Sequence, residues 1–198
     1  MKLETSGSEN YSSFFLRFHI PLTKKDIQFR FDLFSKPTAW VYGYSSRTEN
    51  GQYVLFHDYD NIVFKDLVNE LIFLQKRFNL SDYYVFKTRK DGFHAVCLDT
   101  MPLISAYNIQ KTTSCDMAFV HSVKYLKTKE WVLRWNKKGS RPAPYFFTKV
   151  PSKVDKRIKS SAHAKFLEKL GAPISKGGSW DRCKKLGIVK YTTANRIV

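Results

Sequence analysis

Cysteine is scarce in this chain, which holds three, Cys97, Cys115 and Cys183, among its 198 residues. They are too few and too scattered for a disulfide framework or a CxxC-type zinc site, which indicates a reducing compartment. Long apolar runs are also missing, since no stretch approaches the ~20 residues that span a bilayer. The start of the chain lacks the apolar segment of a secretory signal. The sequence therefore predicts a cytoplasmic or otherwise intracellular protein without a membrane partner.

Acidic side chains are half as frequent as basic ones. The chain has 34 Lys and Arg against 17 Asp and Glu, a formal net charge of +17. Such an excess indicates a polyanionic partner such as nucleic acid, nucleotide or an acidic membrane surface. The membrane surface is disfavoured because the sequence has no strongly amphipathic basic helix of useful length. Because 43% of the residues are hydrophobic and 16% are aromatic, a disordered chain is excluded and a sizeable core is expected.

The basic excess is unevenly distributed along the chain. Residues 1–150 carry 22 basic and 14 acidic side chains, whereas residues 151–198 carry 12 and 3, a net charge of +9. The change coincides with the proline-rich passage 141–151, where regular elements are interrupted. We therefore expect one domain over 1–150 and a basic tail over 151–198 that contacts nucleic acid.

Short apolar stretches rich in β-branched and aromatic residues favour strands in much of the chain. The expected strands cover residues 14–20, 27–34, 40–44, 52–57, 83–87, 93–98, 117–123, 131–135 and 145–150. Apolar residues spaced by three and four predict a helix over 62–78. In the tail, serine N-caps and glycines predict two more helices, over 160–170 and 179–186.

These elements predict an α+β fold, with a mostly antiparallel sheet, packed helices and a small basic helical C-terminal appendage. Two short basic helices joined by a glycine-containing loop fit a helix-turn-helix that reads DNA. The same features fit an ordinary packing appendage.

Two carboxylates end the strand expected over 52–57, where the sequence reads His-Asp58-Tyr-Asp60. Side chains two apart on a strand share a face and lie about 7 Å apart. Asp58 and Asp60 in this arrangement suit Mg²⁺ or Mn²⁺, which prefer oxygen ligands and bridge carboxylates to phosphates. The alternative is that Asp58 opens a turn and Asp60 caps the following helix. Asp116, at the entrance of the strand expected over 117–123, would complete a metal site, and Asp99, after the strand expected over 93–98, competes for this role. Asp116 fits a surface turn residue equally well.

A polar turn with two cations, Arg89 and Lys90, precedes His94 on an apolar strand. The backbone amides and cations of such a turn can receive phosphate oxygens, and a histidine just beyond can donate to the same phosphates. The alternative is a structural histidine within a β-hairpin.

Arg134 lies inside another apolar strand and is followed by the basic residues Lys137, Lys138 and Arg141. This pattern fits a phosphate-binding strip or, alternatively, a solvated basic edge. Interleaved aromatic side chains either stack on bases or belong to the core. They are Trp131, Trp135, Tyr145 and Phe146.

In their order along residues 50–140, these motifs resemble the catalytic domain of the archaeo-eukaryotic primase superfamily, the primase-polymerase fold. The apolar strand ending in Asp58-Tyr-Asp60 is similar to the family's Asp-x-Asp motif, and Gly92-Phe-His94 is similar to its small-residue-x-His motif. The helix expected between them stands where the family has one. Asp116 is preferred over Asp99 for the third acidic position.

The resemblance implies an RRM-like core and template-directed nucleotidyl transfer, as in a DNA primase or polymerase acting in replication. It implies that Asp58, Asp60 and Asp116 hold two Mg²⁺ or Mn²⁺ ions. His94, Arg89 and Lys90 would hold the phosphates of a nucleoside triphosphate. Arg134 would lie near the triphosphate or the single-stranded DNA template, and Lys137, Lys138 and Arg141 would follow it as nucleic-acid-binding residues.

The resemblance also implies a plasmid or viral source. Because the chain is small and has no GxxxxGK[ST] loop, we expect either a separate helicase partner or a sequence shortened from a longer protein. A non-catalytic nucleic-acid-binding module is the main alternative, since it would use the same basic and aromatic surface without metal. A rolling-circle initiator nuclease is a further alternative. It needs a His-hydrophobic-His pair, which neither His19-Ile-Pro21 nor His57-Asp-Tyr59 supplies.

Overall fold

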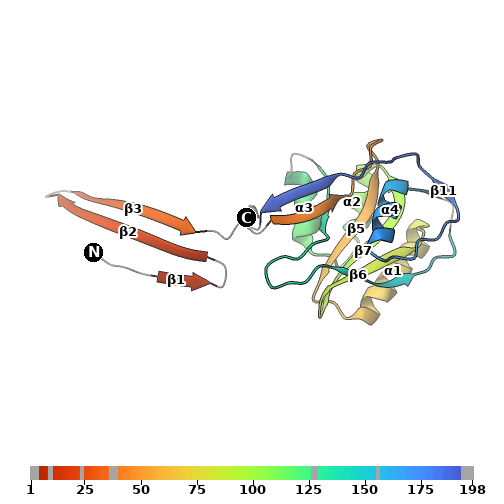
Figure 1. Ribbon diagram of the computed structural model, residues 1–198, viewed down its shortest axis with the longest axis horizontal. Helices are drawn as coiled ribbons and strands as arrows, with labels where there is room; N and C mark the ends of the chain where they lie inside the picture. Colours follow the sequence, from red (N-terminus) through yellow and green to blue (C-terminus); the bar gives the residue numbers. More distant parts are fainter. Residues whose placement is uncertain are drawn as a thin grey trace. The chain divides into compact units, whose positions relative to one another are not determined.

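The computed structural model describes residues 5–8, 11–22, 25–35, 40–125, 129–154 and 157–192. The chain divides into two compact units (Figure 1). One consists of residues 1–40 with 192–198, and the other of residues 41–191. The boundary expected near residue 150 lies inside the second unit.

The first unit contains a three-stranded antiparallel sheet. Its strands, in spatial order, are β1 (Thr5–Ser8), β2 (Tyr11–Leu22) and β3 (Lys25–Ser35). The long β2–β3 pair confirms the strands expected over 14–20 and 27–34 and extends both. In its register most apolar residues pair with apolar residues, as a period-two alternation requires.

The second unit is built around β7, the central strand of a mostly antiparallel sheet. The strands of this sheet are β5 (Tyr53–Asp60), β6 (Tyr83–Arg89), β7 (Gly92–Met101), β9 (Tyr145–Val150), β10 (Ile158–Lys159) and β11 (Ser179–Trp180). Strand β7 pairs with β5, β6 and β10, while β9 adds to β6 and β11 runs parallel to β10. The four long strands are those expected from the sequence, so the α+β class and its antiparallel sheet are confirmed.

A smaller sheet completes the strands of this unit. It consists of β4 (Trp40–Ser45) between β8 (Val132–Arg134) and β12 (Ile188–Thr192), and β4 and β8 are antiparallel. The strands expected over 40–44 and 131–135 are thereby confirmed.

Helix α1 (Phe64–Phe78) follows β5, as the spacing of its apolar residues predicts. Leu67, Leu71 and Leu74 are fully buried on one face of the helix. The helix ends at Asn79, whose left-handed backbone conformation (φ 59°) closes its last turn.

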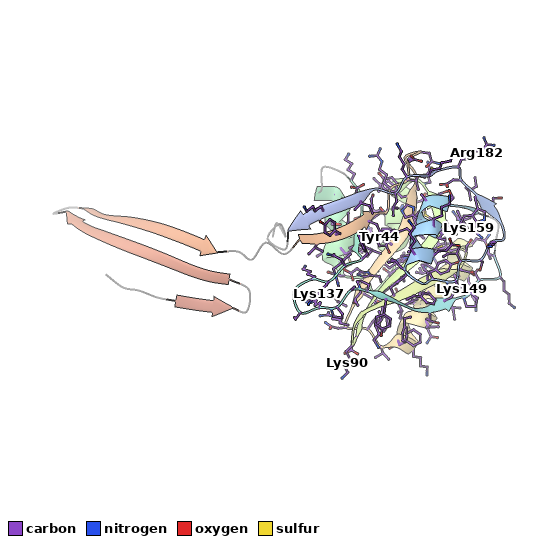
Figure 2. The ribbon with its side chains drawn as sticks, in the orientation of Figure 1. Tyr44, Lys90, Lys137, Lys149, Lys159 and Arg182 are labelled. Carbon is purple, nitrogen blue, oxygen red and sulfur yellow. The ribbon has the colours of Figure 1, made fainter. Side chains whose placement is uncertain are left out.

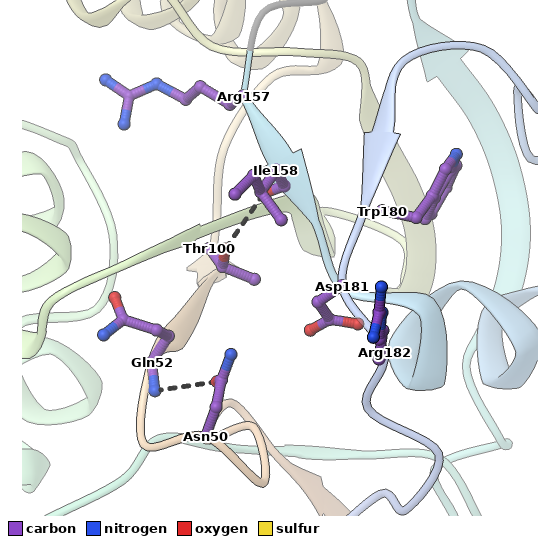
Figure 3. Close-up of a pocket in the computed structure, with 8 residues that line it drawn as sticks. All are labelled: Asn50, Gln52, Thr100, Arg157, Ile158, Trp180, Asp181 and Arg182. Atoms are coloured by element: carbon purple, nitrogen blue, oxygen red, sulfur yellow. Dashed lines mark hydrogen bonds between the residues drawn. The ribbon is translucent and has the colours of Figure 1, made fainter.

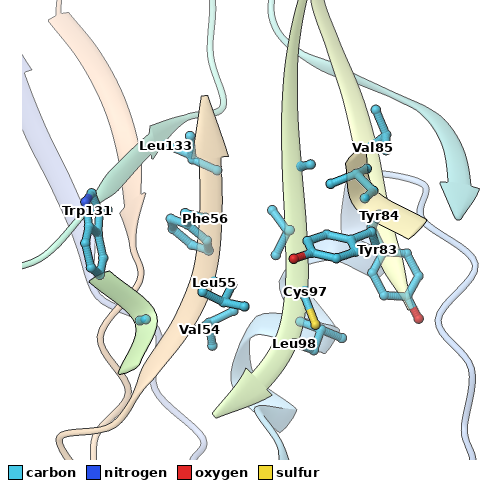
Figure 4. Packing of buried hydrophobic residues seen from close by; sticks show 14 of the residues in the cluster. Val54, Leu55, Phe56, Tyr83, Tyr84, Val85, Cys97, Leu98, Trp131 and Leu133 are labelled. Carbon is cyan, nitrogen blue, oxygen red and sulfur yellow. The ribbon is translucent and has the colours of Figure 1, made fainter. Parts of the chain in front are cut away.

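Strand β5 is covered on both faces, which explains its uninterrupted apolar run. On one face the Tyr59 hydroxyl donates to Glu70 of α1 (2.9 Å). On the other face Phe56 packs against Tyr44 of β4 and against His163 of α4 (Ser161–Lys169), with ring centroids 5.0 and 5.8 Å apart. Figure 4 shows the buried cluster around this strand. The covering elements leave only the last residues of β5 partly open to solvent.

The sequence does not predict helix α2 (Leu103–Gln110), which follows β7. It is fixed to β5 because Gln110 Nε2 donates to the Phe56 carbonyl (2.6 Å). Within the part of the chain that the structure describes, no helix combines the length and apolarity needed to cross a bilayer.

The strand expected over 117–123 is wrong, because this segment forms helix α3 (Met117–Tyr125). The Asp116 carboxylate accepts a hydrogen bond from a backbone amide of the first turn (2.9 Å), as an N-cap residue does. Val120 and Val123, three residues apart, are buried on one side of the helix. Tertiary packing therefore outweighs their preference for strands.

The tail packs on the domain. The helix expected over 160–170 is confirmed as α4, and its Leu167 is fully buried in the core cluster. The helix expected over 179–186 is wrong, since this segment contains only β11 and irregular structure. The Asp181 carboxylate there accepts a hydrogen bond from the Ser161 amide (2.8 Å). The helix-turn-helix interpretation is therefore wrong as well.

Candidate functional site

Strands β5 and β7 lie side by side (Figure 1), and Asp58 and His94 are paired across them at the partly open end of β5. The Asp58 Oδ1 and His94 Nε2 atoms are 3.6 Å apart, and the two side chains are 24% and 7% exposed. Asp58 and His94, from the two motifs that the sequence singles out and 36 positions apart in the chain, therefore meet in one place. Asp58 lies within the strand, so the expectation that it opens a turn is wrong.

His94 is neutral at physiological pH. Burial lowers its pKa to about 3, because the protein interior solvates the imidazolium poorly, and the positive charge of Arg134 lowers it further. The contact with Asp58 is therefore not an ion pair at neutral pH. A neutral imidazole can donate one N–H to a phosphate oxygen. Because it carries no positive charge, it does not compete with a metal cation for the Asp58 carboxylate.

Asp60 pairs with Arg89 of the β6–β7 hairpin. The Arg89 Nη2 atom lies 2.9 Å from Asp60 Oδ1 and 3.3 Å from Asn61 Oδ1. Asp60 does not cap α1, because the residue preceding that helix is Val63 and makes no side-chain capping bond. The expectation that Asp60 caps the helix is therefore wrong, and its carboxylate is 41% exposed.

Gly92 leaves space for the Arg89 side chain, because it has no Cβ atom. A Cβ atom at this position would lie 2.6 Å from Arg89 Cγ and 2.7 Å from Thr88 Oγ1, closer than non-bonded carbon atoms approach. The glycine of the small-residue-x-His motif is thus explained by sterics alone.

Asp116 is brought to β5 by its backbone, since its amide donates to the Asp58 carbonyl (2.9 Å). Its carboxylate caps α3, as described above. Asp99 lies elsewhere: it is five residues along β7 from His94, about 17 Å for an extended strand, and it accepts a hydrogen bond from the Ser81 amide (2.8 Å). Of the two candidates for the third carboxylate, Asp116 is the one near Asp58.

A buried pair that the sequence did not single out holds the Asp116 segment. Cys115 Sγ lies 3.3 Å from His57 Nδ1, and His57 Nε2 lies 3.2 Å from the Tyr83 hydroxyl. Burial lowers the pKa of His57 to about 3 and raises that of Cys115 to about 12, so neither group is charged at neutral pH. This pair is structural. It could have been expected from the sequence, because side chains alternate along β5 and His57 therefore lies on the face opposite Asp58.

Among the residues whose side chains the structure describes, no group of three or more His, Cys, Asp and Glu side chains is arranged to hold a metal ion. The three aspartates therefore do not form a closed cage of ligands. Asp58 and Asp60 remain as two carboxylates on one face of the strand, with cationic or neutral nitrogen groups beside them.

Arg134 comes to the site from β8. Its Nη1 atom donates to the carbonyls of Asn136 (2.8 Å) and Pro142 (2.6 Å), which fixes the guanidinium near His94. The Pro142 bond also attaches the following basic turn to this end of the domain.

The basic strip forms a tight turn. The backbone amides of Lys138 and Arg141 donate to each other's carbonyls, both at 3.0 Å. Lys137 and Arg141 are exposed, and Figure 2 shows Lys137 and Lys90 reaching into solvent. Lys90 occupies the β6–β7 turn.

The four aromatic candidates behave differently. Trp131 is fully buried and donates its indole N–H to the Val120 carbonyl (3.2 Å), so its stacking on bases is excluded. Trp135 and Phe146 are half-buried, and Phe146 packs on Phe86. Tyr145 is 54% exposed.

A pocket lies at the other end of β7, lined by residues from several elements (Figure 3). Its lining residues are Asn50, Gln52, Thr100, Arg157, Ile158, Trp180, Asp181 and Arg182. It contains none of the site residues that the sequence predicts.

Comparisons of this chain with protein-family models, with curated proteins and with solved structures give no match. The function is therefore argued from the geometry of the site and from the charge of the chain.

Proposed function

We propose that residues 41–191 catalyse template-directed nucleotidyl transfer, as a DNA primase or polymerase of replication does. One observation carries the proposal: Asp58 and Asp60, His94, the Asp116 backbone and Arg134 come from distant parts of the chain to the partly open end of β5. Acidic oxygen ligands beside a neutral imidazole and arginines are the groups that a triphosphate and its divalent ion require.

The carboxylates fit a divalent cation in donor chemistry. Mg²⁺ is usually bound by one or two carboxylates together with substrate phosphates and water, and it does not need a full protein cage. Asp58 and Asp60 share a face of β5, are partly exposed and offer oxygen ligands. Asp116, attached to the Asp58 backbone, is the third acidic group of the proposed site.

When bound, Mg²⁺ or Mn²⁺ would lower the pKa of a primer hydroxyl and neutralise the triphosphate. The residues of this chain would bind and orient the reactants. Neutral His94 would donate to a phosphate oxygen, and Arg134 would supply positive charge near it. Arg89 and Lys90 would hold the outer phosphates from the β6–β7 turn.

Single-stranded template and nucleoside triphosphates are the proposed partners, and a separate helicase would open duplex DNA. The net charge of +17 supports a polyanionic partner. The exposed Lys137 and Arg141, with Lys138 between them in sequence, are attached to Arg134 through Pro142 and would contact the template backbone.

A non-catalytic nucleic-acid-binding module is the second candidate. It is favoured by the present partners of the acidic groups, because Asp60 pairs with Arg89 and the Asp116 carboxylate caps α3. In that case the acidic groups would stabilise the fold, and the basic surface alone would function.

Primer extension and template binding, measured on the same variants, distinguish the two functions. Asp58→Asn and Asp60→Asn are compared with Asp66→Asn, an exposed aspartate on α1. We expect the wild type and Asp66→Asn to incorporate nucleotides with Mg²⁺ or Mn²⁺, and the two site variants to lose at least 100-fold in rate while retaining affinity for a labelled single strand. A wild-type protein that neither extends a primer nor makes a dinucleotide is a binding module.

A further inference from the structure

Three strands present a row of side chains on the sheet face opposite His94. Lys87 of β6 is paired with Phe93 of β7 on one side and with Tyr145 of β9 on the other. Because neighbouring residues of a strand point to opposite faces, Phe93 lies on the reverse side from His94. The row therefore belongs to a different surface from the proposed catalytic site.

Two more phenylalanines join this row. Phe64, at the start of α1, and Phe147 of β9 have ring centroids 5.1 Å apart in an edge-to-face arrangement. Phe93 lies 5.8 Å from Phe64 and 5.9 Å from Phe147. The rings of Phe64, Phe93 and Phe147, with Tyr145 and Lys87 beside them, are called the aromatic platform below.

The aromatic platform is partly open to solvent: Phe93 is buried (2% exposed), whereas its other three rings reach the surface. Phe64, Phe147 and Tyr145 are 37%, 39% and 54% exposed, and Val63 next to Phe64 is 65% exposed. Three of the nine large hydrophobic residues found exposed in the described part of the chain therefore belong to the platform, and a fourth, Val63, adjoins Phe64 in sequence. Exposed apolar side chains that are gathered together, and not scattered singly, mark candidate interaction sites.

A lysine is held within the platform. The Lys87 Nζ atom lies 5.1 Å from the centroid of the Phe147 ring and 5.7 Å from that of Phe93, within the range of a cation–π interaction. A further lysine, Lys65, is exposed and adjoins Phe64 in sequence. Aromatic faces with a lysine held against them suit a ligand that has both flat rings and phosphates.

We infer that the aromatic platform binds single-stranded nucleic acid by stacking bases on Phe147, Phe64 and Tyr145. Proteins that bind single strands without sequence preference combine exposed aromatic rings with positive charge. The lysine held at the platform, together with the net charge of +17, favours a polyanion over an apolar protein partner. The identification of the bound strand as the template rests on the proposed function. The stacking of bases on the platform is independent of that function.

Phe147→Leu tests the inference, because it keeps apolar volume and removes the ring. Phe73→Leu is the matched control, since Phe73 is an exposed phenylalanine of α1 (49%) without a contact to the platform rings. The probe is an oligo(dT) strand with one 2-aminopurine, whose fluorescence is quenched when it stacks. We expect Phe147→Leu to weaken binding about tenfold and to lose quenching, while Phe73→Leu leaves both unchanged.

The variant Lys87→Gln tests the role of the lysine charge, and sedimentation tests whether the platform is an interface between copies of this chain. We expect Lys87→Gln to weaken binding and lower its salt dependence without changing the thermal midpoint by more than a few degrees. Unchanged affinity and quenching in a folded Phe147→Leu protein would overturn the inference. So would a loss of self-association at unchanged affinity, because the platform would then be an interface between copies of this chain. If the wild type never extends a primer but Phe147→Leu loses quenching, the proposed catalytic function is wrong and the inference that the platform binds a single strand is supported.

Discussion

The Arg89 guanidinium lies 2.9 Å from the Asp60 carboxylate, on the same face of the sheet as Asp58 and His94. One arginine thereby neutralises an acidic group that the proposed function assigns to a divalent cation. The same arginine is one of the groups proposed to hold phosphates. A cation at Asp60 and a phosphate at Arg89 would therefore each compete with this ion pair.

Arg89→Gln is expected to change the affinities for metal and nucleotide in opposite directions. Removing the guanidinium leaves Asp60 without its cation, so Mn²⁺ should bind severalfold more tightly in the absence of nucleotide. The loss of a phosphate ligand should weaken nucleotide binding by about tenfold. Electron paramagnetic resonance of free Mn²⁺ and calorimetry with a triphosphate measure the two effects.

The matched variant for this experiment is Arg77→Gln, an exposed arginine on α1. It should leave both affinities unchanged. Equal metal affinity in Arg89→Gln and the wild type would show that Asp60 is not a metal ligand.

Folding stability is expected to fall steeply in mild acid. Burial lowers the pKa values of His57, His94 and His163 to about 3, 3 and 4, so the folded protein keeps these side chains neutral. The unfolded chain protonates them near pH 6.5 and therefore binds more protons between pH 6.5 and about 4. Each histidine contributes about 1.4 kcal/mol per pH unit, so stability should fall by about 4 kcal/mol per unit as pH decreases through this window.

Urea unfolding at several pH values between 7 and 4.5 measures this slope. Carboxylates that also titrate at the acid end are separated by the variant His57→Gln, which should lower the slope by about 1.4 kcal/mol per unit. An identical slope in the variant would show that His57 is protonated in the folded protein.

Much of the site follows from local sequence, because β5 and β7 are buried on both sides and their apolar runs are unmistakable. The motifs at Asp58 and His94 lie where the sequence predicts them, at one end of paired strands. The choice between Asp116 and Asp99 was not available from spacing, since it depends on the register of β7 and on a backbone bond to Asp58. The pairing of Asp60 with Arg89 depends on the hairpin geometry, which residue types alone do not specify.

The tail shows a different limit of sequence reasoning. Its charge predicts a basic tail that contacts nucleic acid, but charge reports only the exposed side of an element. The buried side of α4 packs Leu167 into the core and Phe166 against Tyr44, with ring centroids 4.8 Å apart. Because the apolar side of α4 has so few residues, the sequence does not indicate which elements this helix packs against.

Leu167→Ala is accordingly expected to destabilise the whole second unit by about 2–5 kcal/mol, as large-to-small substitutions in a core do. Lys165→Ala, on the exposed side of the same helix, is the control and should change stability by less than about 0.5 kcal/mol. Chemical unfolding followed by tryptophan fluorescence measures both. A cost at Leu167 as small as that at Lys165 would mean that the tail does fold apart from the domain.

Gly92→Ala should destabilise the β6–β7 hairpin, because the added Cβ would lie 2.6 Å from Arg89 Cγ. We expect a cost of about 1–3 kcal/mol, typical of overpacking. The same substitution in an Arg89→Ala background should cost less, since Cγ is then absent and only the contact with Thr88 remains. Chemical unfolding of the four proteins of this double-mutant cycle gives the coupling, and a coupling of zero would show that Arg89 moves aside freely.

The basic turn offers a test by salt dependence. Each phosphate contact with a single strand contributes about 0.7 to the slope of log affinity against log salt concentration. Lys137→Gln with Arg141→Gln should therefore lower the magnitude of this slope by about 1.4 if both side chains contact the template backbone. Lys76→Gln with Arg77→Gln, a pair of equal charge on the exposed surface of α1, should leave the slope unchanged. Equal reductions in the two double variants would mean that the positive charge acts as a diffuse field, because specific contacts at the 137–141 turn would lower only one slope.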